Sequence, residues 1–115
     1  MLVTFFIISP VPPTIDEDGV SKTNLSVIAE RPVVIDCPAQ GTPPPDITWL
    51  KNGYEINLNL NSGVRVISKG RRLEIPSSDV ADAGDYTCVA KNPAGEISKD
   101  FSLDVWGWYI NVKID

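Results

Sequence analysis

The sequence contains no histidine, only two cysteines and no apolar run long enough to cross a bilayer. Histidine is the usual general base at neutral pH and the commonest metal ligand, so its absence argues against an enzyme or a metalloprotein. Basic residues are also scarce, since 10 lysines and arginines face 15 aspartates and glutamates and the formal net charge is −5. Such a domain lacks the basic face that binds phosphate groups, so nucleic acid is not an expected partner.

Prolines and glycines, by contrast, are frequent, with 10 and 8 in 115 residues. They divide the chain into short segments, as an all-β fold with many turns requires, and no helical period competes with this pattern. The absence of a helical period excludes β-α-β units and the phosphate-binding loops that they carry. No nucleotide site and no cofactor are therefore expected. The regular spacing predicts a sandwich or barrel with about eight strands, at residues 10–15, 33–37, 47–51, 54–56, 64–67, 72–75, 86–90 and 101–105.

Alternation within these segments predicts which side chains face the core, because successive residues of a strand point to opposite faces. The inward set is Val33, Ile35, Cys37, Ile47, Trp49, Leu73, Ile75, Tyr86, Cys88, Ala90, Phe101, Leu103 and Val105. Between two of the strands, Asn52 and Gly53 fit a type I′ turn, which needs positive φ at both positions. One domain with a single core suits this chain length.

The two cysteines, Cys37 and Cys88, are too few and too far apart for a zinc site, and their separation suits one long-range disulfide. A redox or nucleophilic pair is the alternative. Both residues fall on inward faces, however, and the sequence has no histidine to activate a thiolate. The disulfide interpretation indicates an oxidising compartment.

The spacing of four residues resembles that of an immunoglobulin domain. Trp49 follows Cys37 by 12 positions, and Tyr86 precedes Cys88 by two. Residues 82–88, with the sequence Asp-Ala-Gly-Asp-Tyr-Thr-Cys, are similar to the family segment Asp-x-Gly-x-Tyr-x-Cys. The chain is therefore identified as a member of the immunoglobulin-like domains.

The resemblance implies an all-β, two-sheet Greek-key sandwich of the intermediate type, or I-set. In such a sandwich a disulfide between Cys37 and Cys88 joins the sheets and Trp49 packs against the sulfurs. The resemblance further implies that the Tyr86 hydroxyl binds backbone at a corner, where Gly84 permits the turn. These positions are structural, so the resemblance implies no enzymatic activity.

The same resemblance pairs Arg65 with Asp82 as an ion pair at one end of the sandwich. Residues 41–45, 49–53 and 90–95 are similar to turns of I-set repeats that occur in tandem arrays, and among these the chain resembles hemicentin-like matrix repeats. The likeness therefore implies contact with neighbouring immunoglobulin domains and with other proteins.

The domain expected from this likeness covers residues 10–105. The flank at residues 1–9 is largely apolar but far shorter than the ~20 residues that span a membrane, so no membrane insertion is expected. A truncated signal peptide, a continued strand and an arbitrary chain boundary remain its alternatives. The aromatic flank at residues 106–115 suits either an added strand or an exposed tail.

Three further motifs have a functional and a structural interpretation. Asn24-Leu25-Ser26 fits the N-glycosylation sequon, which matters only on a secretory route. The basic turn at residues 69–72 favours weak glycosaminoglycan contact or is simply a solvated hairpin tip. The acidic residues 16–19 lack the remaining oxygen ligands of a calcium site and are better explained as a solvated turn.

The sequence thus predicts a non-catalytic interaction or structural module of an extracellular matrix or cell-adhesion protein. The alternative is a repeat of an intracellular, sarcomeric muscle scaffold, in which both cysteines stay reduced. The cysteine pair and the sequon favour the extracellular hypothesis.

Overall fold

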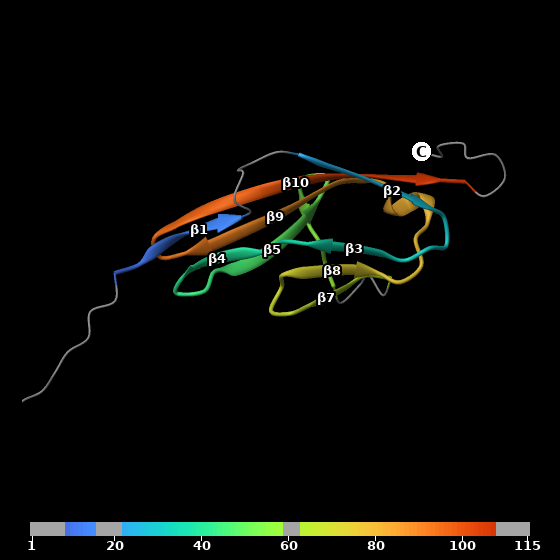
Figure 1. The fold of residues 1–115 in the computed structure, drawn as a ribbon. Helices are drawn as coiled ribbons and strands as arrows, with labels where there is room; N and C mark the ends of the chain where they lie inside the picture. Colours follow the sequence, from blue (N-terminus) through green and yellow to red (C-terminus); the bar gives the residue numbers. More distant parts are fainter. Residues whose placement is uncertain (1–8, 16–21, 59–62, 108–115) are drawn as a thin grey trace, which may run out of the picture.

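Two β-sheets pack face to face in the computed structural model, with a short two-stranded sheet beside them (Figure 1). The structure describes residues 9–15, 22–58 and 63–107. The five-stranded sheet has the order β2 (Thr23–Ile28), β10 (Gly95–Trp106), β9 (Gly84–Asn92), β5 (Asp46–Lys51) and β6 (Tyr54–Glu55). The three-stranded sheet has the order β3 (Val33–Asp36), β8 (Arg72–Ile75) and β7 (Arg65–Ile67), while β1 (Val11–Ile15) pairs with β4 (Ala39–Thr42).

The chain crosses repeatedly between the two main sheets. It leaves β3 for β5 and β6, returns to β7 and β8, and then enters β9 through a short 3₁₀ helix, η1 (Val80–Asp82). Neighbouring strands are antiparallel except for β2, which runs parallel to β10 over six register pairs. This arrangement is the all-β sandwich that the sequence predicted.

The described residues form ten strands, two more than the eight predicted. The additional strands are β2 and β4. In β2, partly buried residues alternate with exposed ones, because one face of the strand packs on the core and the other meets solvent. The short strand β4 follows Cys37 and Pro38, where proline supplies no backbone donor and the ladder of β3 is interrupted. Neither segment has the long apolar run by which a strand is most easily recognised.

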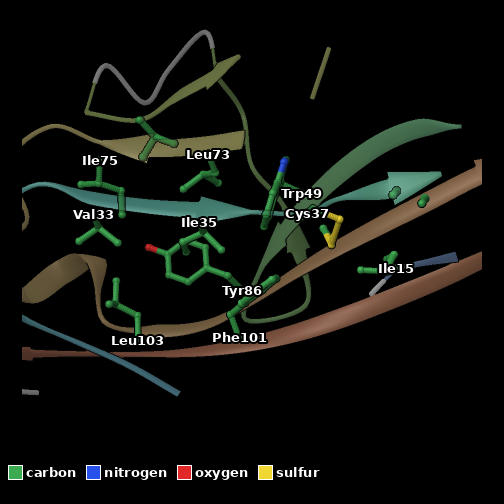
Figure 2. Packing of buried hydrophobic residues seen from close by; sticks show 14 of the residues in the cluster. Ile15, Val33, Ile35, Cys37, Trp49, Leu73, Ile75, Tyr86, Phe101 and Leu103 are labelled. Atoms are coloured by element: carbon green, nitrogen blue, oxygen red, sulfur yellow. A yellow bond between two sulfur atoms is a disulfide. The ribbon is translucent and has the colours of Figure 1, made fainter. Parts of the chain in front are cut away.

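The core lies between the sheets and contains the inward set predicted from strand alternation (Figure 2). Most of that set is fully buried, and Ile47 is partly buried against the rest. The ring centroids of Trp49 and Phe101 lie 6.0 Å apart across the middle of this core. At the predicted hairpin turn Asn52 and Gly53 have φ angles of 51° and 87°, which fit the type I′ turn.

Candidate interaction surfaces

The disulfide lies at the centre of the sandwich. Cys37 directly follows β3 and Cys88 lies in β9, so the Sγ–Sγ bond of 2.16 Å joins the two main sheets. Both cysteines are completely buried. The Trp49 indole stands beside them (Figure 2), and its Nε1 donates to the Gly70 carbonyl at 2.6 Å. The core therefore also fixes the turn between β7 and β8.

The tyrosine side chain of β9 closes one end of the core. The Tyr86 hydroxyl donates to the Asp82 carbonyl at 2.6 Å, while its ring is 1% exposed. Burial of the ring, and secondarily the charge of Asp82, raises the pKa of the phenol. From the outer side Lys51 donates its Nζ to the Ala81 carbonyl and lies 5.8 Å from the Tyr86 ring centroid. The turn before β9 is thus held by two side chains from different strands.

A close approach of two segments explains the glycine at this corner. Gly84 has a φ of +145°, and a Cβ there would lie 2.8 Å from Asn52 Oδ1. That oxygen accepts a hydrogen bond from Asp85 N at 3.0 Å, and Asn52 N donates to the Asp85 carbonyl at 2.7 Å. The sequence predicts the turn at Asn52, but no local pattern indicates this second role.

The predicted ion pair is not present in the structure. Arg65 Nη2 lies 3.5 Å from Glu74 Oε2, and Asp82 Oδ2 accepts a hydrogen bond from Asp79 N within the capping box of η1. Strand phase gives the reason. Val64 and Val66 point toward the core, so Arg65 must point outward, where its cross-strand neighbour is Glu74.

At the opposite end of β9, a buried asparagine joins three segments that are distant in sequence. Asn92 Nδ2 donates to the carbonyls of Val11 at 2.7 Å and Pro43 at 3.0 Å. Its Oδ1 accepts from Ala94 N at 2.9 Å and Gly95 N at 3.2 Å. These contacts tie β1, the loop after β4 and the turn before β10 together. Sequence reasoning missed this residue because it assigned Asn92 only to a turn.

The outer face of the three-stranded sheet carries ion pairs between neighbouring strands. Arg72 Nε lies 2.8 Å from Asp36 Oδ1, and this hydrogen bond, together with the carboxylate charge, raises the pKa of the guanidinium. Val34 and Ile67 are exposed between the charged residues of this face. An exposed ion pair adds little stability, so the face is a solvated surface with two apolar positions.

The basic turn retains two unpaired cations. Arg72 is engaged with Asp36, whereas Lys69 and Arg71 are exposed and make no ion pair in the described part of the chain. Two exposed cations form a small cluster that salt screens, so an attraction for a sulfated glycan would be weak. Glycosaminoglycan contact therefore stays a prediction.

One comparison identifies the fold family. The model of the immunoglobulin I-set domain matches residues 19–105. The chain belongs to the immunoglobulin I-set family. Members of this family are non-enzymatic structural and adhesion modules, and the chain is accordingly a protein-interaction module without catalytic activity.

Relatives of this I-set domain occur in very long proteins. Human hemicentin-1 is 43% identical over 96 residues, which cover 84% of this chain and 2% of that protein. Mouse hemicentin-2 is 38% identical over 95 residues, covering 83% of this chain and 2% of that protein. The chain thus spans a small fraction of the length of these relatives.

Solved structures with the same fold come from different kinds of protein. Drosophila OTK, extracellular domains 3–5, has a TM-score of 0.72 and 31% identity over 84% of this chain and 32% of that one. A variant of titin domains I67–I69 has a TM-score of 0.69 and 27% identity over 84% of this chain and 33% of that one. The fold alone consequently does not decide between compartments.

The remaining sequence predictions concern the margins of the I-set domain. Strand β10 ends at Trp106, the first residue of the predicted aromatic flank. The described residues do not include 1–8, 16–19 or 108–115. Most of the apolar flank and the acidic residues considered as a calcium site therefore lie outside them. Among those described, no cluster of three metal-ligating side chains occurs, and no helix is long and apolar enough to span a bilayer.

Proposed function

We propose that this I-set domain is one module of a multidomain extracellular matrix or cell-adhesion protein. The observation that carries the proposal is the similarity to hemicentin-1, at 43% identity over 84% of the chain. In this role the domain acts by contact, presenting strand edges, sheet faces and loops to neighbouring immunoglobulin domains and to other proteins.

The central disulfide supports this proposal. Disulfides persist in secreted and extracellular proteins, whereas glutathione and thioredoxin keep cytosolic thiols reduced. The Cys37–Cys88 geometry brings the two sulfurs within bonding distance without any other cysteine in the sequence to compete. An oxidising compartment would therefore make the bond a permanent part of the core.

The alternative function is a repeat of an intracellular muscle scaffold. The specific observation in its favour is the likeness to titin domains I67–I69. In this case Cys37 and Cys88 would remain thiols, and apolar packing around Trp49 would hold the sandwich together.

The redox state of the two cysteines distinguishes these functions. Protein isolated from its natural source is denatured and treated with a thiol-alkylating reagent, with and without prior reduction, and the masses of the peptides that contain Cys37 and Cys88 are measured. The proposal expects no alkylation before reduction and two alkylated cysteines after it. A sample treated with alkylating reagent during lysis controls for oxidation after cell rupture. Two alkylated cysteines without reductant would instead establish the scaffold function as the better one.

A further inference from the structure

Asn24 is the one asparagine of the sequence in an Asn-x-Ser/Thr frame, and the structure leaves it accessible. In β2 the side chains of Leu25 and Val27 pack against the core, so Asn24 and Ser26 both point to the outer face and both are exposed. Asn24 makes no side-chain hydrogen bond or ion pair in the described part of the chain. Buried Asn92, in contrast, is fully committed to hydrogen bonds.

The surroundings of Asn24 leave space for a bulky substituent. Its register partner in β10 is Ser102, and Ser26 lies opposite Asp104. On its other side no strand of the described residues pairs with β2, which ends the order of the five-stranded sheet. A modified Asn24 would therefore project over a polar face and past an open sheet edge.

That open edge lacks the usual protection against pairing with another strand. Edge strands are commonly kept short, charged or rich in proline. Among the other strands that end a described sheet, β6 has two residues, β7 has three with Arg65 among them, β1 contains two prolines, β3 ends in Asp36 and β4 has four residues. The six residues Thr23–Ile28 of β2 contain neither charge nor proline, and Ile28 is 44% exposed. The strand that carries the sequon is thus the longest terminal strand among the described residues without a charge or a proline.

We propose that Asn24 carries an N-linked glycan and that this glycan covers the free edge of β2. The inference rests on the proposed extracellular function, because N-glycosylation requires passage through the secretory pathway. A hydrophilic and bulky glycan at this position blocks the approach of a second strand without any charged residue in the edge itself.

The first experiment tests the site. The full chain is directed through the secretory pathway of a eukaryotic host by an added leader, and its mobility is compared before and after treatment with an N-glycosidase. The wild type and Ser26→Thr should lose apparent mass on treatment. Asn24→Gln and Ser26→Ala should be unchanged, and Ser26→Ala is the matched control because it leaves Asn24 in place. A secreted, disulfide-bonded wild type with no loss of mass would overturn the proposal.

The same digestion on protein from its natural source separates this inference from the proposed function. A glycosidase-sensitive mass of the peptide that contains Asn24 supports both. A bonded Cys37–Cys88 pair with no sensitivity overturns the glycan at Asn24 and leaves the extracellular function standing. Free thiols with no sensitivity overturn both.

A second experiment tests the cover over the edge. Size-exclusion chromatography at rising concentration should show a monomeric wild type and Ser26→Thr, while Asn24→Gln and Ser26→Ala, from the same host, shift toward larger species. Adding Ser26→Lys to Asn24→Gln should restore the monomer, because a charge at the edge opposes pairing. If Asn24→Gln stays as monomeric as the wild type, the glycan does not serve to cover the edge.

Discussion

The two ends of β9 are closed in different ways. At one end Tyr86 makes a single side-chain hydrogen bond, to the carbonyl of Asp82 four residues earlier, and most of its contribution is the buried ring. At the other end Asn92 places a small polar side chain in four hydrogen bonds, two of which reach Val11 and Pro43, 81 and 49 positions away. The first end is thus held by a buried aromatic ring and a hydrogen bond between residues close in sequence. The second end is held by hydrogen bonds between segments that are distant in sequence.

This difference determines how each end fails. Removing the Tyr86 hydroxyl leaves only the Asp82 carbonyl without its donor, and water near the surface can replace that donor. Truncating the buried asparagine leaves several backbone groups without partners, and an unsatisfied buried group costs more than a hydrogen bond contributes. The Asn92 end should therefore be the more sensitive of the two to a single substitution.

Reduction of the disulfide should have the largest effect, because the bond joins the sheets between the two ends. Cys37 and Cys88 are separated by 51 positions. In the chain-entropy model closing a loop of this length is worth about 4 kcal/mol, a large share of the stability of a small domain. Urea denaturation with and without reductant measures the loss of unfolding free energy. Coincident melts of fully bonded and fully reduced protein would show that the bond does not stabilise the domain.

Substitution of Asn92 by alanine should destabilise the domain by about 3 kcal/mol, because two backbone carbonyls and two backbone amides of a partly buried junction lose their partner at once. Chemical denaturation gives the free energy of unfolding. Asn24→Ala is the matched control, since exposed Asn24 should change stability by no more than about 0.5 kcal/mol. Equal effects of the two substitutions would remove the proposed difference between a buried and an exposed asparagine.

Tyr86→Phe should cost about 1–3 kcal/mol without changing the fold, because the ring remains packed while the Asp82 carbonyl loses its donor. The measurement is the urea midpoint, with circular dichroism to establish that the fold is retained. A midpoint identical to that of the wild type would mean that the corner hydrogen bond contributes nothing to stability.

The stability of the Tyr86 end should also depend on pH. The pKa of the buried phenol is raised above its ordinary value of 10.0, so above that pH the unfolded chain releases a proton that the folded chain retains. The contribution of Tyr86 is therefore complete below about pH 10 and declines above it, by up to about 1.4 kcal/mol per pH unit. The gap in unfolding free energy between wild type and Tyr86→Phe should narrow between about pH 9 and 11. A constant gap over this range would contradict the expectation.

The smallest effect is expected for Arg65, which lies outside both ends. Its exposed pair with Glu74 predicts a change below about 0.5 kcal/mol for Arg65→Ala. Asp82→Ala removes a capping interaction of η1 and should cost about 1 kcal/mol. A double-mutant cycle should give a coupling energy below about 0.5 kcal/mol. Strong coupling would restore the ion pair that the structure does not show.

Local sequence patterns predicted the central part of the fold well. Alternation identified Ile35, Leu73 and Leu103 as inward residues because period two is a property of any strand, and all three are at most 1% exposed. The disulfide between the sheets and the packing of Trp49 against it followed from the resemblance to immunoglobulin domains, which the spacing of Cys37, Trp49, Tyr86 and Cys88 carries. Such features depend on strand geometry or on a short motif, so they can be predicted from the sequence.

One wrong ion pair and one missed hydrogen-bond junction could not be predicted from local sequence patterns. The family resemblance pairs Arg65 with Asp82, whereas the inward phase of Val64 and Val66 requires Arg65 to face outward. The role of Asn92 depends on backbone groups brought together only by the folded chain. No pattern near Asn92 identifies those carbonyls as its partners, so this junction was not predictable from the sequence.

The parallel pairing of β2 with β10 also has a mechanical consequence. Tension applied between the segment before Thr23 and the segment after Trp106 pulls the two strands along their axes in opposite directions. All six register pairs, from Thr23 with Phe101 to Ile28 with Trp106, then resist sliding together. In an antiparallel hairpin such as β5 and β6, pulling at the open end separates the pairs one after another. The edge that is most exposed to another strand is thus also the part of the sandwich best oriented to resist tension.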